Sequence, residues 1–440
     1  MAYTETTTVG YGTRVGNSFK GIGTGILMFL AGTALLWWNE GNFVKMDKAL
    51  NEAEGNYEEL SNIDKIDADK DGQLIYATGV AKTADSLVDD QFGIGVNAVK
   101  MQRTVEYYQW VEQVKEEKKD KLGGSQEIKK TYTYKQEWVS QPVQSSQFKD
   151  PAAQSRNRNF VLTTVEPESK QATKVTFGAF ELSESQISSI SGREPLELNI
   201  DSAKLVSMSN QARQEYQRNT TTSYGMSNTD TAKYVHADQN VLYFGQNPGA
   251  PAVGDVRVTW TYVKPENKIS IIAKQKDNSF TAYKAKNGKT IQMLTMGTKA
   301  PEEMFQNAHD SNDMMLWVWR IVGIMLVIGG LKGIFGFLET ILKVVPFLAG
   351  IFGWGVGVVC TVVGLVWSLI VIALAWLFYR PLIGITLLVI AGFLIWVFAF
   401  KGKDKLKELA ANAKNRNAAQ PAPAAASAVE AEPQIGSPVE

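Results

Sequence analysis

The chain has 440 residues, which is too long for one ordinary domain and suits two or three parts. Its 45 lysines and arginines balance its 45 aspartates and glutamates, so no basic excess indicates nucleic acid as a partner. The single cysteine, Cys360, excludes an internal disulfide and a thiolate metal cluster.

An apolar run follows the first 20 residues, which are small and polar. Residues 22–38 (IGTGILMFLAGTALLWW) would form a helix about 26 Å long at about 1.5 Å per residue, which matches a bilayer core. Trp37 and Trp38 close the run, and indole rings favour the membrane interface. Because no small-x-small cleavage site follows, we expect an uncleaved anchor helix over 21–39 and a cytoplasmic segment over 1–20.

Residues 40–313 have the composition of a polar globular domain. The domain opens with a charged, helix-compatible stretch through about Leu60. Runs rich in Tyr, Thr, Val and Trp then alternate as half-buried strands do, and the charged residues 115–124 between two of these runs are expected to form a hairpin tip. The expected strands cover 72–80, 99–114, 131–140, 240–246, 255–263, 268–275 and 289–297. Helical patterning is limited to 182–192 and 201–217, so the domain is predicted to be β-rich α+β.

Past Asp313 the chain becomes apolar. Residues 314–338 form an expected span, with Arg320 and Lys332 snorkelling toward opposite interfaces. Residues 347–379 hold no charged side chain and exceed the length of one perpendicular helix. The glycines at 353, 355 and 357 could mark a turn that divides this run into two spans, but we favour one long tilted helix.

Arg380 and Pro381 end that run, and residues 382–400 form a further expected span. The chain is therefore predicted to be a multi-span α-helical membrane protein. It would have four helices, one N-terminal and three C-terminal, and a large β-rich α+β extramembrane domain. Residues 401–440 begin with a basic stretch that has lysines at 401, 403, 405 and 407. They continue as a tail rich in Ala, Pro, Ser and Glu, which is expected to be disordered.

The distribution of basic residues predicts the topology. The lysines after residue 400 favour a cytoplasmic C-terminus, and Arg14 and Lys20 favour a cytoplasmic N-terminus. Four spans satisfy both and place residues 40–313 on the extracytoplasmic or lumenal side.

Little in the chain indicates chemistry at a site. His236 and His309 lie in no HExxH or comparable spacing, and no GxSxG is present, so we assign no catalytic, cofactor-binding or metal-binding residue. Asp67, Asp69 and Asp71 match the first positions of an EF-hand loop, but threonine occupies the twelfth, where a bidentate glutamate belongs. A DKDG turn that enters a strand explains the pattern more simply, with a weak Ca²⁺ site as the alternative.

The membrane edge supplies the candidate site residues. Glu40 follows the two tryptophans, where its carboxylate could pair with an arginine at the same face; the alternative is a solvated anion. Arg380 is the first choice of partner, because Pro381 fixes the turn beside it, and Arg320 is the second. Gly21, Gly25 and Gly32 would let another helix approach the first one closely. The interface candidates are Trp37, Trp38, Asn39, Glu40, Gly41, Arg320, Arg380 and Pro381.

Five strings, in this order, resemble the LUMA family, also called the transmembrane protein 43 family. They are LLWWNEG (35–41), VKMQRTVEYYQWVE (99–112), TYTYKQEW (131–138), VGDVRVTWTY (253–262) and WLFYRP (376–381). The resemblance covers roughly residues 22–400. It implies a membrane-embedded scaffold, because the animal members organise protein complexes in the endoplasmic reticulum and inner nuclear membrane, with lamins and emerin among their partners. It implies no catalytic residue. The acidic Ala/Pro-rich tail differs from the animal members and indicates a bacterial member.

We therefore expect a non-enzymatic scaffold that organises or anchors protein complexes at a membrane. Its expected partners are the lipid bilayer, other membrane proteins and, in a homo-oligomer, further copies of the chain, but no nucleic acid. A binding module that senses lipid or envelope stress is the alternative, and a membrane-bound enzyme is the third hypothesis. The location would be the inner (cytoplasmic) membrane in a bacterium, and the endoplasmic reticulum or inner nuclear membrane in a eukaryote.

Overall fold

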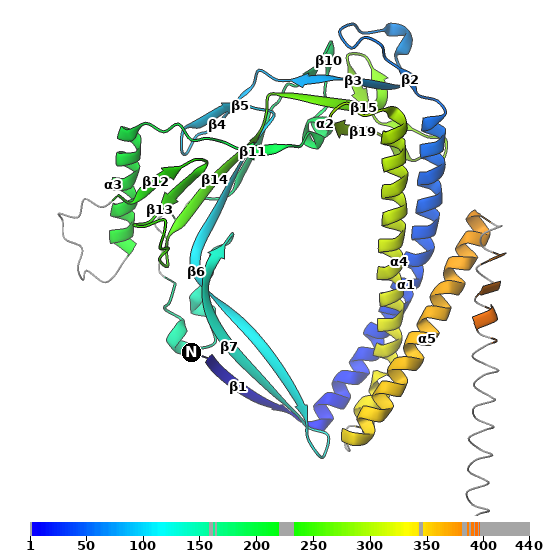
Figure 1. The fold of residues 1–440 in the computed structure, drawn as a ribbon. Helices are drawn as coiled ribbons and strands as arrows, with labels where there is room; N and C mark the ends of the chain where they lie inside the picture. Colours follow the sequence, from blue (N-terminus) through cyan, green and yellow to red (C-terminus); the bar gives the residue numbers. More distant parts are fainter. Residues whose placement is uncertain are drawn as a thin grey trace, which may run out of the picture. The chain divides into compact units, whose positions relative to one another are not determined.

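The computed structural model describes residues 2–157, 162, 165–219, 233–342 and 346–380, together with 385–386, 389–390, 392–394 and 396. The chain divides into two compact units, Met1–Gly364 and Leu365–Glu440. The first unit contains all of the described strands (Figure 1). The long helix before residue 380 begins in the first unit and continues into the second.

Three of the described helices are long and apolar enough to cross a membrane, namely α1, α4 and α5. This confirms the predicted class, helical spans with a large β-rich domain, but with three spans among the described residues where four were expected. The expected fourth span, 382–400, lies largely outside the described residues, and the tail 401–440 lies wholly outside them. The helices are α1 (Tyr11–Glu54), α2 (Glu184–Ser189), α3 (Ser202–Asn219), α4 (Pro301–Leu342) and α5 (Pro346–Tyr379), with 3₁₀ turns at Ala68–Lys70, Ser145–Gln147 and Pro151–Ala153.

The two helices that flank the polar domain are longer than the expected spans 21–39 and 314–338. Helix α1 has 44 residues and α4 has 42, and each continues without a break from its apolar part into the polar domain. The added turns are stabilised because they bury side chains against the seven-stranded sheet. Helix α5 is one uninterrupted helix, so the glycines at 353–357 do not divide it into two.

An eight-stranded sheet forms the part of the polar domain farther from the helices (Figure 1). Its central strand β14 alternates as predicted, with Val256, Val258 and Trp260 buried and the residues between them partly exposed. The buried side chains join those of β6, β13 and the region of α3 in one core. The order is β1 (Ala2–Val9), β7 (Gln126–Val139), β6 (Lys100–Asp120), β14 (Val256–Val263), β13 (Val241–Phe244) and β12 (Val235–Asp238), with β8 (Glu168–Gln171) on β6 and β11 (Arg193–Pro195) on β14.

A seven-stranded sheet lies next to the helix pair. Its longest pairing is antiparallel, between β15 and β3, and Ile75, Ile269 and Ile271 from these strands are fully buried in a second core. The order is β19 (Met293–Met296), β15 (Glu266–Lys276), β16 (Ser279–Thr281), β10 (Phe180–Glu181), β9 (Thr176–Phe177), β3 (Leu74–Lys82) and β2 (Glu58–Glu59). Two small ribbons complete the strands, β4 (Ser86–Asp89) with β5 (Ile94–Asn97) and β17 (Tyr283–Lys284) with β18 (Thr290–Ile291).

A third core joins the helix pair to this sheet. Leu50 and Ala53 of α1 and Phe305 of α4 are buried against Tyr76 of β3 and Ile272 of β15. Moving either helix away from the sheet would expose these apolar side chains to water, which is unfavourable and therefore restricts such movement. The polar domain is therefore attached to both flanking helices by a packed core.

The β6–β7 hairpin is longer than the sequence predicted. The charged run 115–124 was expected at its tip, but β6 continues through Asp120, so most of the run is strand. Lysines and glutamates on the two strands pair across the ladder, as Glu116 does with Lys130 at 3.7 Å, and these pairs offset the poor strand propensity of charged residues. We call residues 108–138, which extend past β14, the tongue.

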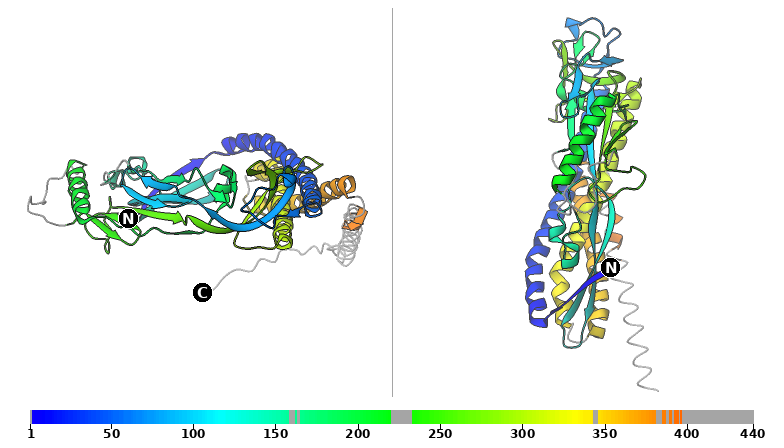
Figure 2. Two further views of the ribbon diagram at one scale, coloured as in Figure 1. Left: turned by 90° about the horizontal axis from the view of Figure 1, so that it is seen from above. Right: turned by 90° about the vertical axis from the view of Figure 1, so that its left-hand side faces the viewer.

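The N-terminal residues are also part of this sheet. Residues 2–9 were expected only as a small polar segment, but they form β1 and pair antiparallel with β7, from Ala2 opposite Thr133 to Val9 opposite Gln126. The four threonines of AYTETTTV suit a strand, and its mostly exposed side chains suit the edge of a sheet. Figure 2 shows from a second side that β1 and the tongue reach the end of α1 at which the helix begins.

Helices α1 and α4 pack antiparallel through glycines. A Cβ atom added to Gly25 would lie 2.7 Å from the carbonyl oxygen of Gly330, and one added to Gly32 would lie 2.9 Å from the carbonyl oxygen of Gly323. Real Cβ atoms do not approach backbone so closely. The two helix backbones are therefore in direct contact, as in other membrane helix pairs with small residues at the interface.

This contact generates a matched prediction. Gly32→Ala should lower the melting temperature of the detergent-solubilised protein, because the new methyl group must push α4 away. Gly23→Ala is the control, since a Cβ atom there meets nothing within 4 Å, and alanine is favoured over glycine in a helix by about 1 kcal/mol. If Gly32→Ala melts at or above the temperature of Gly23→Ala, the close approach of the two backbones is disproved.

Candidate functional site

The candidate site lies where α1 and α4 leave their apolar segments and enter the polar domain. Trp37 and Trp38 of α1 are 39% and 55% exposed, and Trp317 of α4, at the same level, is 60% exposed. Exposed indole rings at one level of both helices are typical of the membrane interface. Directly beside these rings, Asn39, Glu40 and Gly41 are buried.

Glu40 and Arg320 form a bidentate ion pair at this level. The Arg320 Nε atom donates to Glu40 Oε1 at 2.6 Å, and Arg320 Nη2 donates to Glu40 Oε2 at 2.9 Å. Glu40 has no exposed surface, and the Arg320 side chain is 12% exposed. The guanidinium carbon also lies 4.9 Å from the centre of the Trp317 ring. Both charges are thus compensated inside the helix contact.

Asparagine side chains extend the polar contact along the two helices. Asn39 Nδ2 donates to the carbonyl oxygen of Leu316 at 3.0 Å, and Asn312 Nδ2 donates to that of Phe43 at 3.2 Å. One turn farther into the polar domain, His309 Nδ1 lies 3.3 Å from Asp47 Oδ1. Hydrogen bonds between helices fix their rotation and their relative depth, which apolar contact alone does not do.

A cavity of about 380 Å³ lies next to these contacts. Its wall combines the amide side chains of Asn39, Asn42 and Asn312 with apolar side chains of both helices, such as Phe43 and Met315. The ammonium group of Lys289, on the loop before β18, donates to Asn42. The arrangement can hold a small polar group at the membrane edge, but it presents no nucleophile beside a general base.

The structure therefore brings together two of the candidate charges that the sequence suggested. Glu40 is paired with Arg320, the second choice of partner, and the solvated-anion alternative is wrong because the carboxylate is buried. Arg380 belongs to the second unit, where its guanidinium lies 5.4 Å from the ring centre of Trp376. Its pairing with Glu40 stays a prediction, and Pro381 lies outside the described residues.

Three residues that contact the candidate site were not predicted from the sequence. Trp317 lies three positions before Arg320 on α4, so helical spacing alone places the ring beside the guanidinium. No local sequence pattern indicates the contacts of Asn312 and Lys289, because their partners lie more than 240 residues away in the chain.

The other residues considered for chemistry bind their own neighbours. His236 Nε2 lies 3.2 Å from the carbonyl oxygens of Lys233 and Gln246. Asp67 Oδ1 accepts from the amide of Asp69, and Asp71 Oδ1 accepts from that of Asp277. The DKDG segment is a 3₁₀ turn that leads into β3 and not into an EF-hand helix. In the part of the chain that the structure describes, no three His, Cys, Asp or Glu side chains are grouped as metal ligands.

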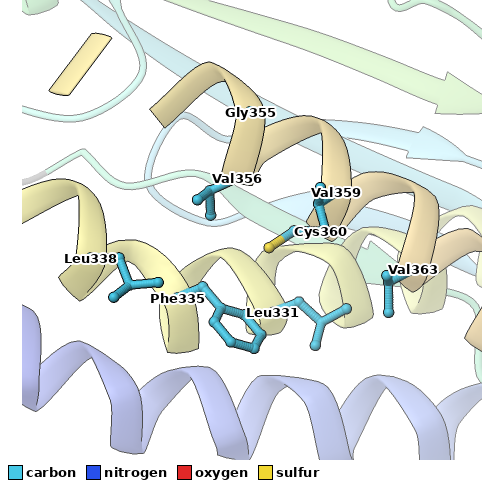
Figure 3. A pocket seen from close by; sticks show the side chains of 8 residues that line it. All are labelled: Leu331, Phe335, Leu338, Gly355, Val356, Val359, Cys360 and Val363. Carbon is cyan, nitrogen blue, oxygen red and sulfur yellow. The ribbon is translucent and has the colours of Figure 1, made fainter. Parts of the chain in front are cut away.

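A second cavity, of about 520 Å³, lies between α4 and residues 355–363 of α5 (Figure 3). Leu331 and Phe335 of α4 face Val356, Val359 and Cys360 of α5 across it, and its wall is apolar. The segments that line it belong to candidate membrane spans.

Comparison with known proteins identifies the relatives of this arrangement. Residues 107–381 match the family described as Transmembrane protein 43. Transmembrane protein 43 of Rattus norvegicus is 29% identical over 383 residues, which cover 85% of this chain and 88% of the rat protein. The Homo sapiens protein is 27% identical over the same length, and the Transmembrane protein 43 homolog of Drosophila melanogaster is 25% identical over 369 residues, 83% of this chain and 90% of the fly protein. No solved structure matches the chain.

A double-mutant cycle tests the ion pair. Glu40→Gln and Arg320→Gln should each lower the free energy of unfolding in detergent by about 3 kcal/mol, because each removes the bidentate partner of a charge that is buried in the helix contact. The double variant should lose less than the sum of the two, by about 1 kcal/mol or more.

The matched control is Glu266→Gln, which removes the exposed pair with Lys82, whose side chains are 57% and 63% exposed. That change should cost about 0–1 kcal/mol. Strict additivity of the two single losses, or losses no larger than that of the control, would show that the pair does not hold the helices together.

Proposed function

The chain belongs to the transmembrane protein 43 family, and we propose that it is a non-enzymatic membrane scaffold that organises or anchors protein complexes. The observation that carries the proposal is the continuity of α1 and α4 from their apolar segments into the core of the polar domain. A scaffold must present its binding surfaces at a fixed height and orientation above the membrane. Two unbroken helices that enter one packed core provide both.

Hydrogen bonds around the third core support a rigid attachment. The Tyr76 hydroxyl donates to the carbonyl oxygen of Lys299, just before α4, at 2.9 Å. The Tyr283 hydroxyl donates to Glu52 of α1, also at 2.9 Å. These bonds fix the polar domain to both helices, and the Glu40–Arg320 pair fixes the two helices to each other. Such a domain is suited to hold partners in place and not to close over a substrate.

The protein is an integral membrane protein, and we propose its sidedness from the charges. The basic residues at 401–407, with Arg14 and Lys20, favour cytoplasmic termini and an extracytoplasmic or lumenal polar domain. The membrane would be the inner membrane of a bacterium, or the endoplasmic reticulum or inner nuclear membrane of a eukaryote. The proposed partners are other membrane proteins, further copies of the chain and the bilayer itself.

A lipid-binding module is the second candidate, and the cavity between α4 and α5 favours it. The wall of this cavity is apolar and lies within candidate spans, so an acyl chain is the ligand that suits it.

Photo-crosslinking in native membranes tests the scaffold. A crosslinking side chain placed at Leu122 or at Val88, which are 84% and 41% exposed, should capture a reproducible set of membrane proteins. Arg320→Gln should reduce that capture at equal protein level, because it loosens α1 from α4 and so disturbs the helix pair that holds the domain, whereas the control Glu266→Gln should leave the capture unchanged. A protein that instead leaves mild detergent as a single chain with only bound phospholipid would contradict the scaffold and favour the lipid-binding module.

A further inference from the structure

The tip of the tongue is bound to the beginning of α1. Arg14, in the first turns of the helix, donates from Nη1 to the carbonyl oxygen of Gly124 at 2.7 Å and from Nη2 to Asp120 at 2.8 Å. The Arg14 side chain is only 8% exposed. The hydroxyl of Tyr11 donates to the carbonyl oxygen of Ile341 at 2.9 Å, so the end of α4 lies at the same level. Figure 1 shows the tongue, β1 and the two helices meeting there.

The tongue and the helix pair therefore cover the same depth. From Glu40 to Arg14, α1 measures about 39 Å at 1.5 Å per residue. From Tyr108 to Asp120, β6 measures about 40 Å at 3.3 Å per residue. Any bilayer that α1 crosses between these two levels must also be crossed by the tongue.

The helix pair cannot lie flat on a membrane surface instead. Helix α1 has no charged residue between Lys20 and Glu40, and apolar side chains such as Leu27 and Leu30 are exposed along it. A helix that lies in the interface needs one strongly polar face, which this segment lacks. The apolar segments of α1 and α4 accordingly cross the bilayer.

The tongue, by contrast, cannot face lipid. Residues 113–119 of β6 are exposed on both faces of the sheet, and five of them are the charged residues Lys115 to Lys119. Both edges are also open within the described residues. Strand β1 ends the sheet, and β6 has no neighbour on its outer edge beyond Trp110, whose backbone is bonded by Asn157. Charged side chains and unpaired strand edges do not occur in contact with hydrocarbon.

We infer that the tongue crosses the membrane inside a ring of copies of this chain, where the tongues line a water-filled interior. The occupant of each open edge is then the next copy, with β1 of one chain beside β6 of its neighbour. Copies in one membrane share one orientation, so the symmetry axis follows the membrane normal and the contact is head-to-tail, which closes into a ring. The inference requires only that α1 crosses the membrane, and it does not depend on the scaffold role. It narrows the sidedness proposed above, because β1 and the tongue then lie within the depth of the membrane and the tongue tip with Leu122 faces the cytoplasm, while the rest of the polar domain is extracytoplasmic or lumenal.

Sidedness and water access are tested first, in full-length protein carrying Cys360→Ser. A maleimide on a large polymer should label Lys264→Cys only from the outside of oriented vesicles, and Leu122→Cys only from the inside. A small charged thiol reagent should react with Val114→Cys, in the middle of the tongue, at a rate comparable with Leu122→Cys. Leu27→Cys, which is 69% exposed on α1, should not react because it faces lipid. Labelling of Lys264→Cys and Leu122→Cys from the same side, or an unreactive Val114→Cys, would overturn the inference.

Disulfide formation tests the contact between copies. Thr6 and Glu117 both lie opposite Lys129 of β7, so within one chain they are separated by two strand spacings, about 9.6 Å. A disulfide spans at most about 7 Å between Cα atoms, so it cannot form within one chain. Thr6→Cys combined with Lys115→Cys, Glu117→Cys or Lys119→Cys should therefore give a ladder of linked chains on a denaturing gel in at least one register.

Thr6→Cys with Lys129→Cys is the control, because these directly opposed residues should form a bond within one chain and no ladder. Absence of that internal bond would show that β1 does not occupy its place on β7, and would overturn the inference. The same holds if the internal bond forms but all three combinations with β6 remain monomeric, because the tongue would then cross without a neighbouring copy.

Discussion

The antiparallel contact between α1 and α4 is the constraint on which the rest of the structure depends. Glycines at 25, 32, 323 and 330 bring the two backbones together, but surrounding lipid is as apolar as another helix and gives no preference for one rotation or depth. The bidentate pair of Glu40 with Arg320 supplies that preference, and Asn39 adds a hydrogen bond to the facing backbone. The glycines therefore permit the contact, and the polar groups specify it.

The contact between α1 and α4 determines the position of the polar domain. Both of its ends are helices that continue into its interior, and the core around Phe305 and Tyr76 joins them to the seven-stranded sheet. At the other end of α1, Arg14 and β1 attach the eight-stranded sheet through its tongue. The first unit is thus fixed to the helix pair at both ends of the apolar segment, which leaves no obvious hinge between membrane helices and domain.

Hydropathy and two-residue alternation were sufficient to predict the membrane helices α1, α4 and α5 and the longer strands β3, β6, β7, β14 and β15, because each depends on local sequence, whereas most of the short strands were not predicted. The glycine contacts and the choice of Arg320 over Arg380 depend on which residues of two distant helices face each other, and no local pattern encodes that. Strand β1 was missed because AYTETTTV becomes a strand only where β7 offers it an edge. The charged residues 115–120 looked like a loop, since their strand form depends on partners across the ladder.

The same ion pair sets an order of events during synthesis. Glu40 precedes Arg320 by 280 residues, which at roughly 5–20 residues per second corresponds to about 14–56 s of translation. Throughout that interval the first helix is already made and its carboxylate lacks Arg320, while the strands between the two helices emerge one after another. Lateral docking of α1 must therefore wait until the polar domain has been made, and a ribosome that stalls before residue 320 leaves a tethered domain with an unanchored first helix.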